Sequence, residues 1–246
     1  MELVTPPERP HFPANPNKFE FDKDVAPIFP NMAKRSIPNY EEAHYLHASI
    51  MAFWFLHKGA SIIDIGASRG LMFSMLSKLY REHGQFLPSM KMVATDSSPH
   101  MCEMMRNDFP LLDVRQQSLL DPEFFDSNEQ YDVVNCMYVL QFVPSEHQER
   151  VLHKLASMVK PGGILVLGQK EKSDGYLGKI LHDQYIDFRT HNGYTRREIE
   201  AKTAALANSM WPIDPYWLAR QLSTLGFREV QETTRYTVFS TLIAYK

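Results

Sequence analysis

The sequence is poor in cysteine, has no long apolar run and carries no excess of positive charge. Its two cysteines, Cys102 and Cys136, exclude a disulfide framework, and both are expected to be unreactive core thiols. No apolar run reaches the length of about 18 residues that a membrane helix needs. The formal net charge of −3 gives no global attraction to nucleic acid, although it does not exclude a local basic patch. Residues 1–30 lack the apolar core of a signal peptide, so a cytoplasmic location is expected.

The short motifs of several enzyme classes are also missing. There is no Gly-x-Gly-x-x-Gly dinucleotide fingerprint, no Gly-x-Ser-x-Gly nucleophile motif and no Walker loop. His44 and His47 lie three residues apart, but no third ligand accompanies them, so no metal is expected. With 246 residues, 44% of them hydrophobic, the chain is long enough for one large globular domain.

Short apolar runs alternate with helical periodicity from residue 61 onward. Strands are predicted at 61–65, 90–95, 111–115, 131–137 and 163–168, and helices at 40–58, 70–83, 98–108, 146–158 and 217–225. This alternation predicts a parallel sheet with helices on both faces. Strand-like runs at 229–236 and 238–245 predict a closing antiparallel hairpin. Residues 1–40, irregular and rich in proline, are expected to form an N-terminal arm, residues 41–246 a single domain, and the helical segment at about 174–210 a lid.

The most informative motif is residues 61–70, Ser-Ile-Ile-Asp-Ile-Gly-Ala-Ser-Arg-Gly. A β-branched strand carrying Asp64 passes through a glycine turn into a helix, which places backbone N–H groups and a helix N-terminus beside a nucleotide-like ligand. Gly66 allows the backbone to approach that ligand closely. The next strand ends in Asp96, whose carboxylate can accept hydrogen bonds from two ribose hydroxyls. The same carboxylate can instead cap the helix that Ser98 and Pro99 open.

The acid-x-Gly-x-x-x-Gly spacing of this loop resembles that of class I S-adenosylmethionine (SAM) methyltransferases. The resemblance implies SAM as the cofactor. It also implies an α/β, Rossmann-like fold, with a mostly parallel seven-stranded sheet, a C-terminal antiparallel hairpin and a helical lid insertion. The cofactor-binding residues that it implies are Arg35 and Tyr40 from the arm, Asp64, Gly66, Ala67 and Ser68 at the amino-acid and ribose portions, Asp96 at the ribose, Ser97, Ser118 and Leu119 at the adenine, and Met137 below the sulfonium.

Further motifs are similar to those of carboxy-S-adenosylmethionine (carboxy-SAM) synthases. Those enzymes make carboxy-SAM from SAM and prephenate for modification of the tRNA wobble uridine. The similar motifs are Phe29-Pro30, Arg35-Ser36 and Pro38-x-Tyr40 in the arm, Leu140-Gln141-Phe142 after the fourth strand, and Asp187-Phe188-Arg189 with Asn192-Gly193-Tyr194 in the lid.

Three positions depart from the pattern of that family. The arginine that pairs with the added carboxylate corresponds to Thr203, and threonine is not a bidentate, permanently charged donor. Arg196 or Arg197, earlier in the lid, is a candidate replacement. An asparagine near the methionyl portion corresponds to Met137, and an acid at the adenine amino group corresponds to Ser118, a weaker acceptor.

These departures favour methyl transfer from plain SAM to a small-molecule acceptor. The sulfonium is already activated, so the protein needs mainly to position the reactants and exclude water. A carboxy-SAM synthase and a non-catalytic SAM-binding subunit stay as alternatives. No general base stands out, and the substrate-side candidates are Tyr138, His182, Tyr185, Tyr194, Arg196 and Arg197.

The partners expected from the sequence are the small-molecule acceptor and a second copy of the chain. A homodimer is expected from the family resemblance and from the apolar helix at 48–56. A membrane is not expected as a partner. A tRNA acceptor would need a basic surface, and the lysines and arginines of the lid are too scattered to predict one.

Overall fold

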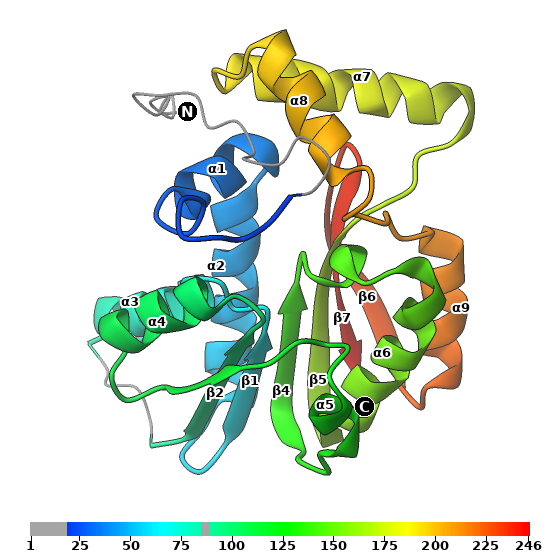
Figure 1. Ribbon diagram of the computed structural model, residues 1–246. Helices are drawn as coiled ribbons and strands as arrows, with labels where there is room; N and C mark the ends of the chain where they lie inside the picture. The colour runs from blue at the N-terminus through cyan, green and yellow to red at the C-terminus, as the bar shows by residue number, and fades with distance from the viewer. Residues whose placement is uncertain (1–18, 85–88) are drawn as a thin grey trace.

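The computed structural model describes residues 19–84 and 89–246 of the chain, which are built around a seven-stranded sheet (Figure 1). The strands are β1 (Ser61–Ile65), β2 (Lys91–Asp96), β3 (Asp113–Gln116), β4 (Tyr131–Met137), β5 (Val159–Lys170), β6 (Glu229–Tyr236) and β7 (Phe239–Tyr245). Their order in the sheet is β3-β2-β1-β4-β5-β7-β6. β1 to β5 are parallel, whereas β7 is antiparallel to both β5 and β6. The predicted parallel sheet and closing hairpin are confirmed.

Helices cover both faces of the sheet, because the central strands carry apolar side chains on both sides. Ile62 of β1 packs in a core with α2 (Tyr40–Ile50) and α3 (Leu71–Glu82). Ile63 and Ile65 point the opposite way and pack in a second core with α6 (Ser145–Ser157) and α9 (Pro215–Thr224). The result is a three-layered α/β domain, as the alternating pattern predicts.

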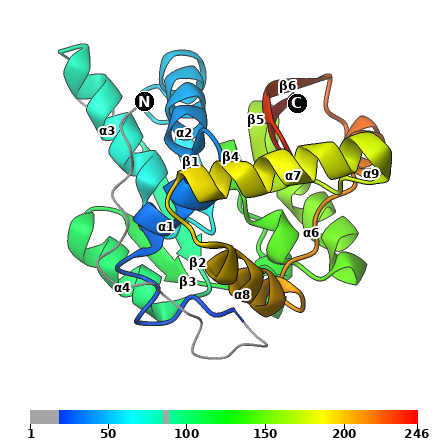
Figure 2. The ribbon, with the colours of Figure 1, turned by 90° about the horizontal axis from the view of Figure 1, so that it is seen from above.

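The predicted lid consists of two helices, α7 (Gly175–His191) and α8 (Arg196–Leu206). They lie beyond the carboxyl ends of the parallel strands, and Figure 2 shows them crossing above the sheet. α8 begins with a capping box, in which Thr195 Oγ1 accepts a hydrogen bond from Glu198 N at 3.2 Å and Glu198 Oε2 accepts one from Thr195 N at 2.8 Å. The capping box therefore fixes the N-terminal end of α8.

Other elements differ from the sequence predictions. The helix predicted at 40–58 is α-helical only to Ile50 and then forms a π-helical turn, η1 (Met51–Phe55). The arm, predicted to be irregular, contains α1 (Phe29–Ser36), because Pro30 lies in the first turn, where a missing N–H breaks no helical hydrogen bond. β5 begins at Val159 rather than at 163. Residues 1–18 of the predicted arm lie outside the described residues.

Three further short elements connect the sheet and position its loops. They are α4 (Pro99–Asp108), α5 (Pro122–Asp126) and the single 3₁₀ turn η2 (Leu140–Phe142). Both η2 and the turn before it follow the carboxyl end of β4, so the motif Leu140-Gln141-Phe142 lies at the same edge of the sheet as the glycine loop.

Candidate functional site

A cavity of about 430 Å³ lies at the carboxyl ends of the parallel strands, below α1, α7 and α8. This is where open α/β sheets bind ligands, because the loops that follow neighbouring strands diverge there. Twelve of the predicted cofactor-binding and substrate-side residues line it, together with Thr203: Tyr40, Asp64, Gly66, Ala67, Ser68, Asp96, Ser97, Ser118, Leu119, Met137, Tyr138 and Tyr185.

Five candidates do not line the cavity. Arg35 and Tyr194 are buried directly behind its wall, 2% and 4% exposed. His182, Arg196 and Arg197 are exposed at the surface. The arginines that the sequence offers as replacements for the missing carboxylate donor are therefore not in the cavity, whereas the buried Arg189 and Lys202 are.

The glycine loop depends on left-handed backbone at two glycines. Gly66 has φ +64°, and a Cβ there would lie 2.4 Å from Val139 Cγ2 of the loop after β4. Gly70 has φ +73°, and a Cβ there would lie 2.8 Å from the ring of Phe109. Both positions therefore require glycine for conformation and for space. The loop is held against β2 by a hydrogen bond from Ala67 N to Thr95 O at 2.9 Å.

Two carboxylates line the cavity beside this loop. Asp96 accepts backbone hydrogen bonds from Ser68 N and Ser98 N, each at 2.9 Å. The cap of α4 is Ser98 itself, whose hydroxyl accepts from Met101 N, so Asp96 orients the loop rather than capping the helix. Asp64 accepts a hydrogen bond from Asn135 Nδ2 at 2.6 Å. Burial, opposed by this bond and supported by the charge of Asp96, raises the pKa of Asp64 to about 7.

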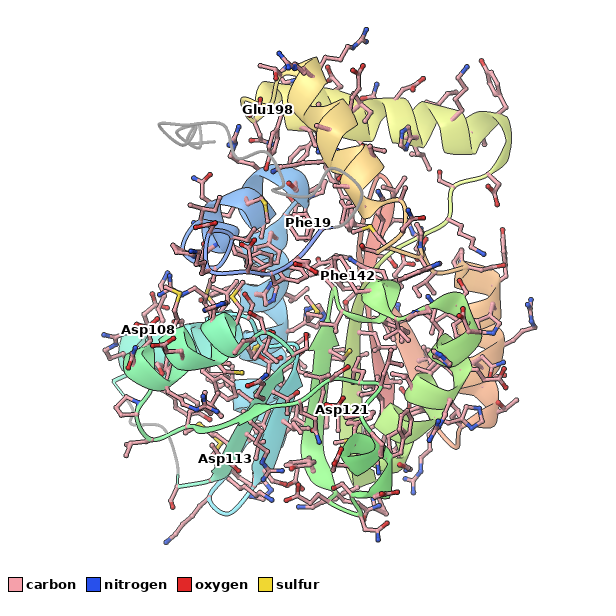
Figure 3. All side chains as sticks on the ribbon, in the orientation of Figure 1. Phe19, Asp108, Asp113, Asp121, Phe142 and Glu198 are labelled. Carbon is pink, nitrogen blue, oxygen red and sulfur yellow. The ribbon has the colours of Figure 1, made fainter. Side chains whose placement is uncertain are left out.

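Aromatic side chains of the arm close one end of the cavity. The ring of Phe21 meets those of Phe29 and Phe142 edge to face, each at 5.5 Å between centroids. Figure 3 shows Phe19 and Phe142 between α8 and the upper edge of the sheet. Ser98 Oγ donates to Phe21 O at 2.5 Å, and Phe19 N donates to Ala205 O of α8, so the arm is tied to both sides of the cavity. These rings lie near Ser97, Ser118 and Leu119, the expected adenine side.

Cationic side chains gather at another part of the cavity wall. Lys170, Arg189 and Lys202 line the cavity, and Arg35 lies behind them. In the described part of the chain none of the four makes a salt bridge, and Arg189 Nε has no hydrogen-bond partner although Arg189 is 5% exposed. Burial and the neighbouring arginines lower the pKa of Lys202 to about 7. Burial and Arg189 lower the pKa of Lys170 to about 8.

Tyr194 holds this cluster together from behind. Its hydroxyl accepts a hydrogen bond from Lys202 Nζ at 2.6 Å and lies 3.2 Å from Ser36 Oγ. The guanidinium carbon of Arg35 lies 4.1 Å from the ring centroid, and Arg35 Nε donates to Asn192 O at 2.6 Å. The two lid and arm motifs noted in the sequence, Arg35-Ser36 and Asn192-Gly193-Tyr194, are therefore in direct contact.

Sequence reasoning missed the role of several cavity residues. Only a weak signal in the sequence marked Lys170, Arg189 and Lys202. Arg189 belongs to a lid motif, and Lys202 directly precedes Thr203. His44, considered only as a metal ligand, lines the cavity on α2. Among the described residues, no group of histidines, cysteines and acids is placed to hold a metal, and no helix is long and apolar enough to cross a membrane.

Comparisons with known proteins agree with this geometry. The profile of the family described as "Methyltransferase domain" matches residues 39–204. The solved structure of magnesium protoporphyrin IX methyltransferase from Synechocystis PCC 6803 with bound S-adenosylhomocysteine (SAH) has a TM-score of 0.62, 15% sequence identity and coverage of 92% of this chain and 96% of that one. A SAM-dependent methyltransferase structure from Methanococcus maripaludis has a TM-score of 0.56 at 19% identity, covering 94% and 95%. The fold, the cavity and the domain match together place the chain among the class I SAM-dependent methyltransferases.

Two relatives of the chain narrow its assignment to one family within this class. The carboxy-SAM synthase of Campylobacter jejuni subsp. doylei is 30% identical over 243 residues, which cover 96% of this chain and 97% of the relative. That of Pseudomonas putida strain W619 is 30% identical over 233 residues, covering 92% of each. The chain belongs to the carboxy-SAM synthase family within the methyltransferase-domain proteins.

The residues of the cavity fit SAM, the cofactor of this class. Asp96 offers a carboxylate whose remaining lone pairs suit ribose hydroxyls. Asp64 is a buried acid that forms no salt bridge with any described residue, which suits an ammonium group. The apolar rings of Phe21 and Phe142 suit a flat base. All of these groups line one cavity, together with the cations of the lid and of β5.

Proposed function

We propose that the protein transfers the methyl group of SAM to an anionic small molecule. The observation that carries this proposal is the cationic cluster of Lys170, Arg189 and Lys202 inside the cavity, which makes no salt bridge within the described part of the chain. Buried cations are costly unless a counter-charge accompanies them. The charge of Glu198 raises the pKa of Lys202, but the Glu198 carboxylate is already bonded to Thr195. An anionic acceptor supplies the missing charge.

Each group then has a defined part in methyl transfer. Asp96 would bind the ribose hydroxyls and Asp64 the ammonium group, and the Gly66–Ser68 backbone would lie along the cofactor. Met137 and Tyr138 would lie beside the reacting carbon. Lys170, Arg189 and Lys202 would orient the acceptor, and α7 and α8 would exclude water. When bound, SAM supplies an activated methyl group, so positioning provides most of the acceleration.

The test is an incubation of the protein with methyl-deuterated SAM and a pool of small organic acids, phenols and amines. Mass spectrometry then identifies every product that carries the label. The proposal predicts label in acids and its loss in the Arg189→Gln variant, with SAM binding kept. Label confined to uncharged acceptors would contradict the proposal.

A second candidate function is carboxy-SAM synthesis from SAM and prephenate. Family membership favours it, and Arg189 and Lys202 lie beside Thr203, where the family's carboxylate-binding arginine is expected. Incubation with SAM and prephenate tests it, since carboxylated SAM would appear only if this activity exists. A non-catalytic SAM-binding subunit is disfavoured, because such a subunit has no need for a cluster of buried cations in its cavity.

We further propose that the protein is a cytoplasmic homodimer and that its acceptor is a small molecule rather than tRNA. Its two cysteines are free and buried, which fits a reducing compartment. On η1, Phe53 and Trp54 are 50% and 79% exposed, and adjacent exposed aromatic rings are typical of an interface. Light scattering after chromatography tests the dimer: Trp54→Glu should give a monomer, whereas Tyr216→Glu, a change at a comparably exposed ring on α9, should not.

A further inference from the structure

His44 presents a neutral imidazole to the cavity in a single orientation. Its Nδ1 lies 2.7 Å from Tyr40 O, the carbonyl one helical turn earlier, so Nδ1 carries the proton and Nε2 carries the lone pair. The ring packs against Tyr40 and Tyr138, with centroids 4.5 and 5.9 Å away. No hydrogen bond engages Nε2 among the residues described. His44 therefore offers the cavity a free acceptor of hydrogen bonds.

A continuous aromatic wall joins His44 to the cationic cluster. Tyr138 lies 6.0 Å from Phe239, and Phe239 lies 5.4 Å from Tyr185, between ring centroids. Beyond Tyr185, Lys170 Nζ and the guanidinium carbon of Arg189 lie 4.9 and 5.5 Å from its ring centroid. All of these side chains line the same cavity. The wall thus has a proton acceptor at one end, flat apolar surface along its length and positive charge at the other end.

His44, which can accept a hydrogen bond, lies at the end of this wall that is nearer the expected cofactor site. Burial raises the pKa of Tyr40, and the charges of Tyr138 and of Asp64, beside the glycine loop, add to this, so Tyr40 is close to the expected ammonium site. His44 packs on Tyr40 and on Tyr138, which directly follows Met137. A nucleophile held by His44 would therefore be near the reacting methyl group, while the cations hold the other end of the molecule.

We infer that the acceptor is a hydroxylated aromatic carboxylic acid, with its carboxylate at Lys170 and Arg189 and its hydroxyl at His44 Nε2; this inference rests on the methyl transfer proposed above. As the hydroxyl oxygen forms its bond to the methyl carbon, the carbon–sulfur bond breaks and its electron pair stays on sulfur. The hydroxyl proton passes to His44 Nε2 and leaves to solvent after the product departs.

The charges in the site keep Nε2 of His44 unprotonated before the reaction, as a proton acceptor must be. Burial, partly offset by the Tyr40 carbonyl and supported by His47, lowers the pKa of His44 to about 4, so the ring is neutral at pH 7. Tyr40, Tyr138 and His47 are the titratable groups that face it, and all three are uncharged at that pH. Sulfur loses its positive charge in the step in which His44 gains one. The net charge of the enclosed site therefore stays constant.

Binding to SAH-loaded protein tests the substrate class without turnover. Three matched probes are titrated by calorimetry: para-hydroxyphenylpropanoate, phenylpropanoate, which lacks the hydroxyl, and para-ethylphenol, which lacks the carboxylate. The hydroxy acid should bind best, and the phenol at least about tenfold more weakly, because a carboxylate between two cations makes charge-assisted bonds. In protein labelled with ¹⁵N-histidine, the His44 Nε2 resonance should shift with the hydroxy acid and not with phenylpropanoate.

Variants test the role of His44. His44→Phe keeps the aromatic wall, so SAM binding should stay within about twofold, whereas methylation of the hydroxy acid should fall by about a hundredfold or more. His83→Gln is the matched control, because His83 Nδ1 lies 2.9 Å from the carbonyl of Leu79, the same local arrangement, but His83 is outside the cavity. That variant should keep full activity.

Three results would overturn the inference. Equal affinity for the phenol and the hydroxy acid would exclude the carboxylate site. An unmoved Nε2 resonance, or full activity of His44→Phe, would show that His44 is not the proton acceptor. Failure of the hydroxy acid to bind a protein that binds SAH would exclude the substrate class and leave methyl transfer to another acid intact. A protein that does not bind SAM at all would instead refute the proposed function.

Discussion

Replacement of Asp64 by asparagine is expected to stabilise the protein without cofactor and to weaken its binding of SAM. The carboxyl is buried and forms no salt bridge within residues 19–84 and 89–246, so burial raises its pKa from 3.8 to about 7. Asparagine has the same shape and keeps an oxygen that can accept the bond from Asn135 Nδ2. The substitution therefore removes a buried charge and little else.

The pH dependence of this effect follows from the direction of the pKa shift. The folded protein holds the Asp64 proton more tightly than the unfolded chain does, so ionisation of Asp64 costs no stability below about pH 4. The cost grows as the pH rises to about 7 and is complete above it. A shift of about three pKa units at about 1.4 kcal/mol per unit sets an upper limit of about 4 kcal/mol at pH 8.

Urea unfolding of the wild type and of Asp64→Asn at pH 4.5 and pH 8, without cofactor, measures this difference. The variant should be more stable at pH 8 by about 2 to 4 kcal/mol and nearly equal to the wild type at the lower pH. Calorimetry at pH 8 should show SAM binding weakened by about tenfold or more, because the ammonium group loses its counter-charge. A variant that is less stable at both pH values, or that binds SAM as tightly as the wild type, would refute the reasoning.

Other substitutions probe the rest of the cavity. Asp96→Ala should weaken SAM binding by about a hundredfold in calorimetry through loss of the ribose contacts, whereas Asp108→Ala, which removes an exposed ion pair, should not. Gly66→Ala should lower the free energy of unfolding by at least about 1 kcal/mol, because of its positive φ and the clash with Val139, and unchanged denaturation midpoints would contradict this. Thr203→Arg should raise affinity for carboxy-SAM over SAM by about tenfold or more in competition binding, since arginine supplies a bidentate donor; an unchanged ratio would show that this position does not face the carboxylate.

The sheet and the glycine loop were predictable because their signals are local. Asp64 and Gly66 lie within one strand–turn–helix unit, and Asp96 ends the next parallel strand. Carboxyl ends of adjacent parallel strands meet at one edge, so the topology alone brings these residues together. The π-helical turn after Ile50 has no such signal, because an apolar run of that length fits a continued α-helix equally well.

The acceptor side was less predictable because it is assembled from distant segments. The search for a cation earlier on the helix of Thr203 suggested Arg196 and Arg197, but the buried face of α8 runs through Glu198, Ile199, Lys202 and Ala205. Which lid cation faces inward depends on how α8 docks on the arm, and no local pattern encodes this. The wall that joins His44 to Phe239 likewise requires α2 and β7, nearly two hundred residues apart in sequence, to share one chamber.

Native mass spectrometry of the purified protein, followed by denaturation and identification of the released small molecule, tests the central claim most directly. Plain SAM or SAH, bound again when added to stripped protein, is the predicted result. Carboxy-SAM as the bound species would contradict methyl transfer from plain SAM and would show that Arg189 and Lys202 replace the arginine absent at Thr203. A protein that releases nothing and binds no added SAM would contradict the account as a whole.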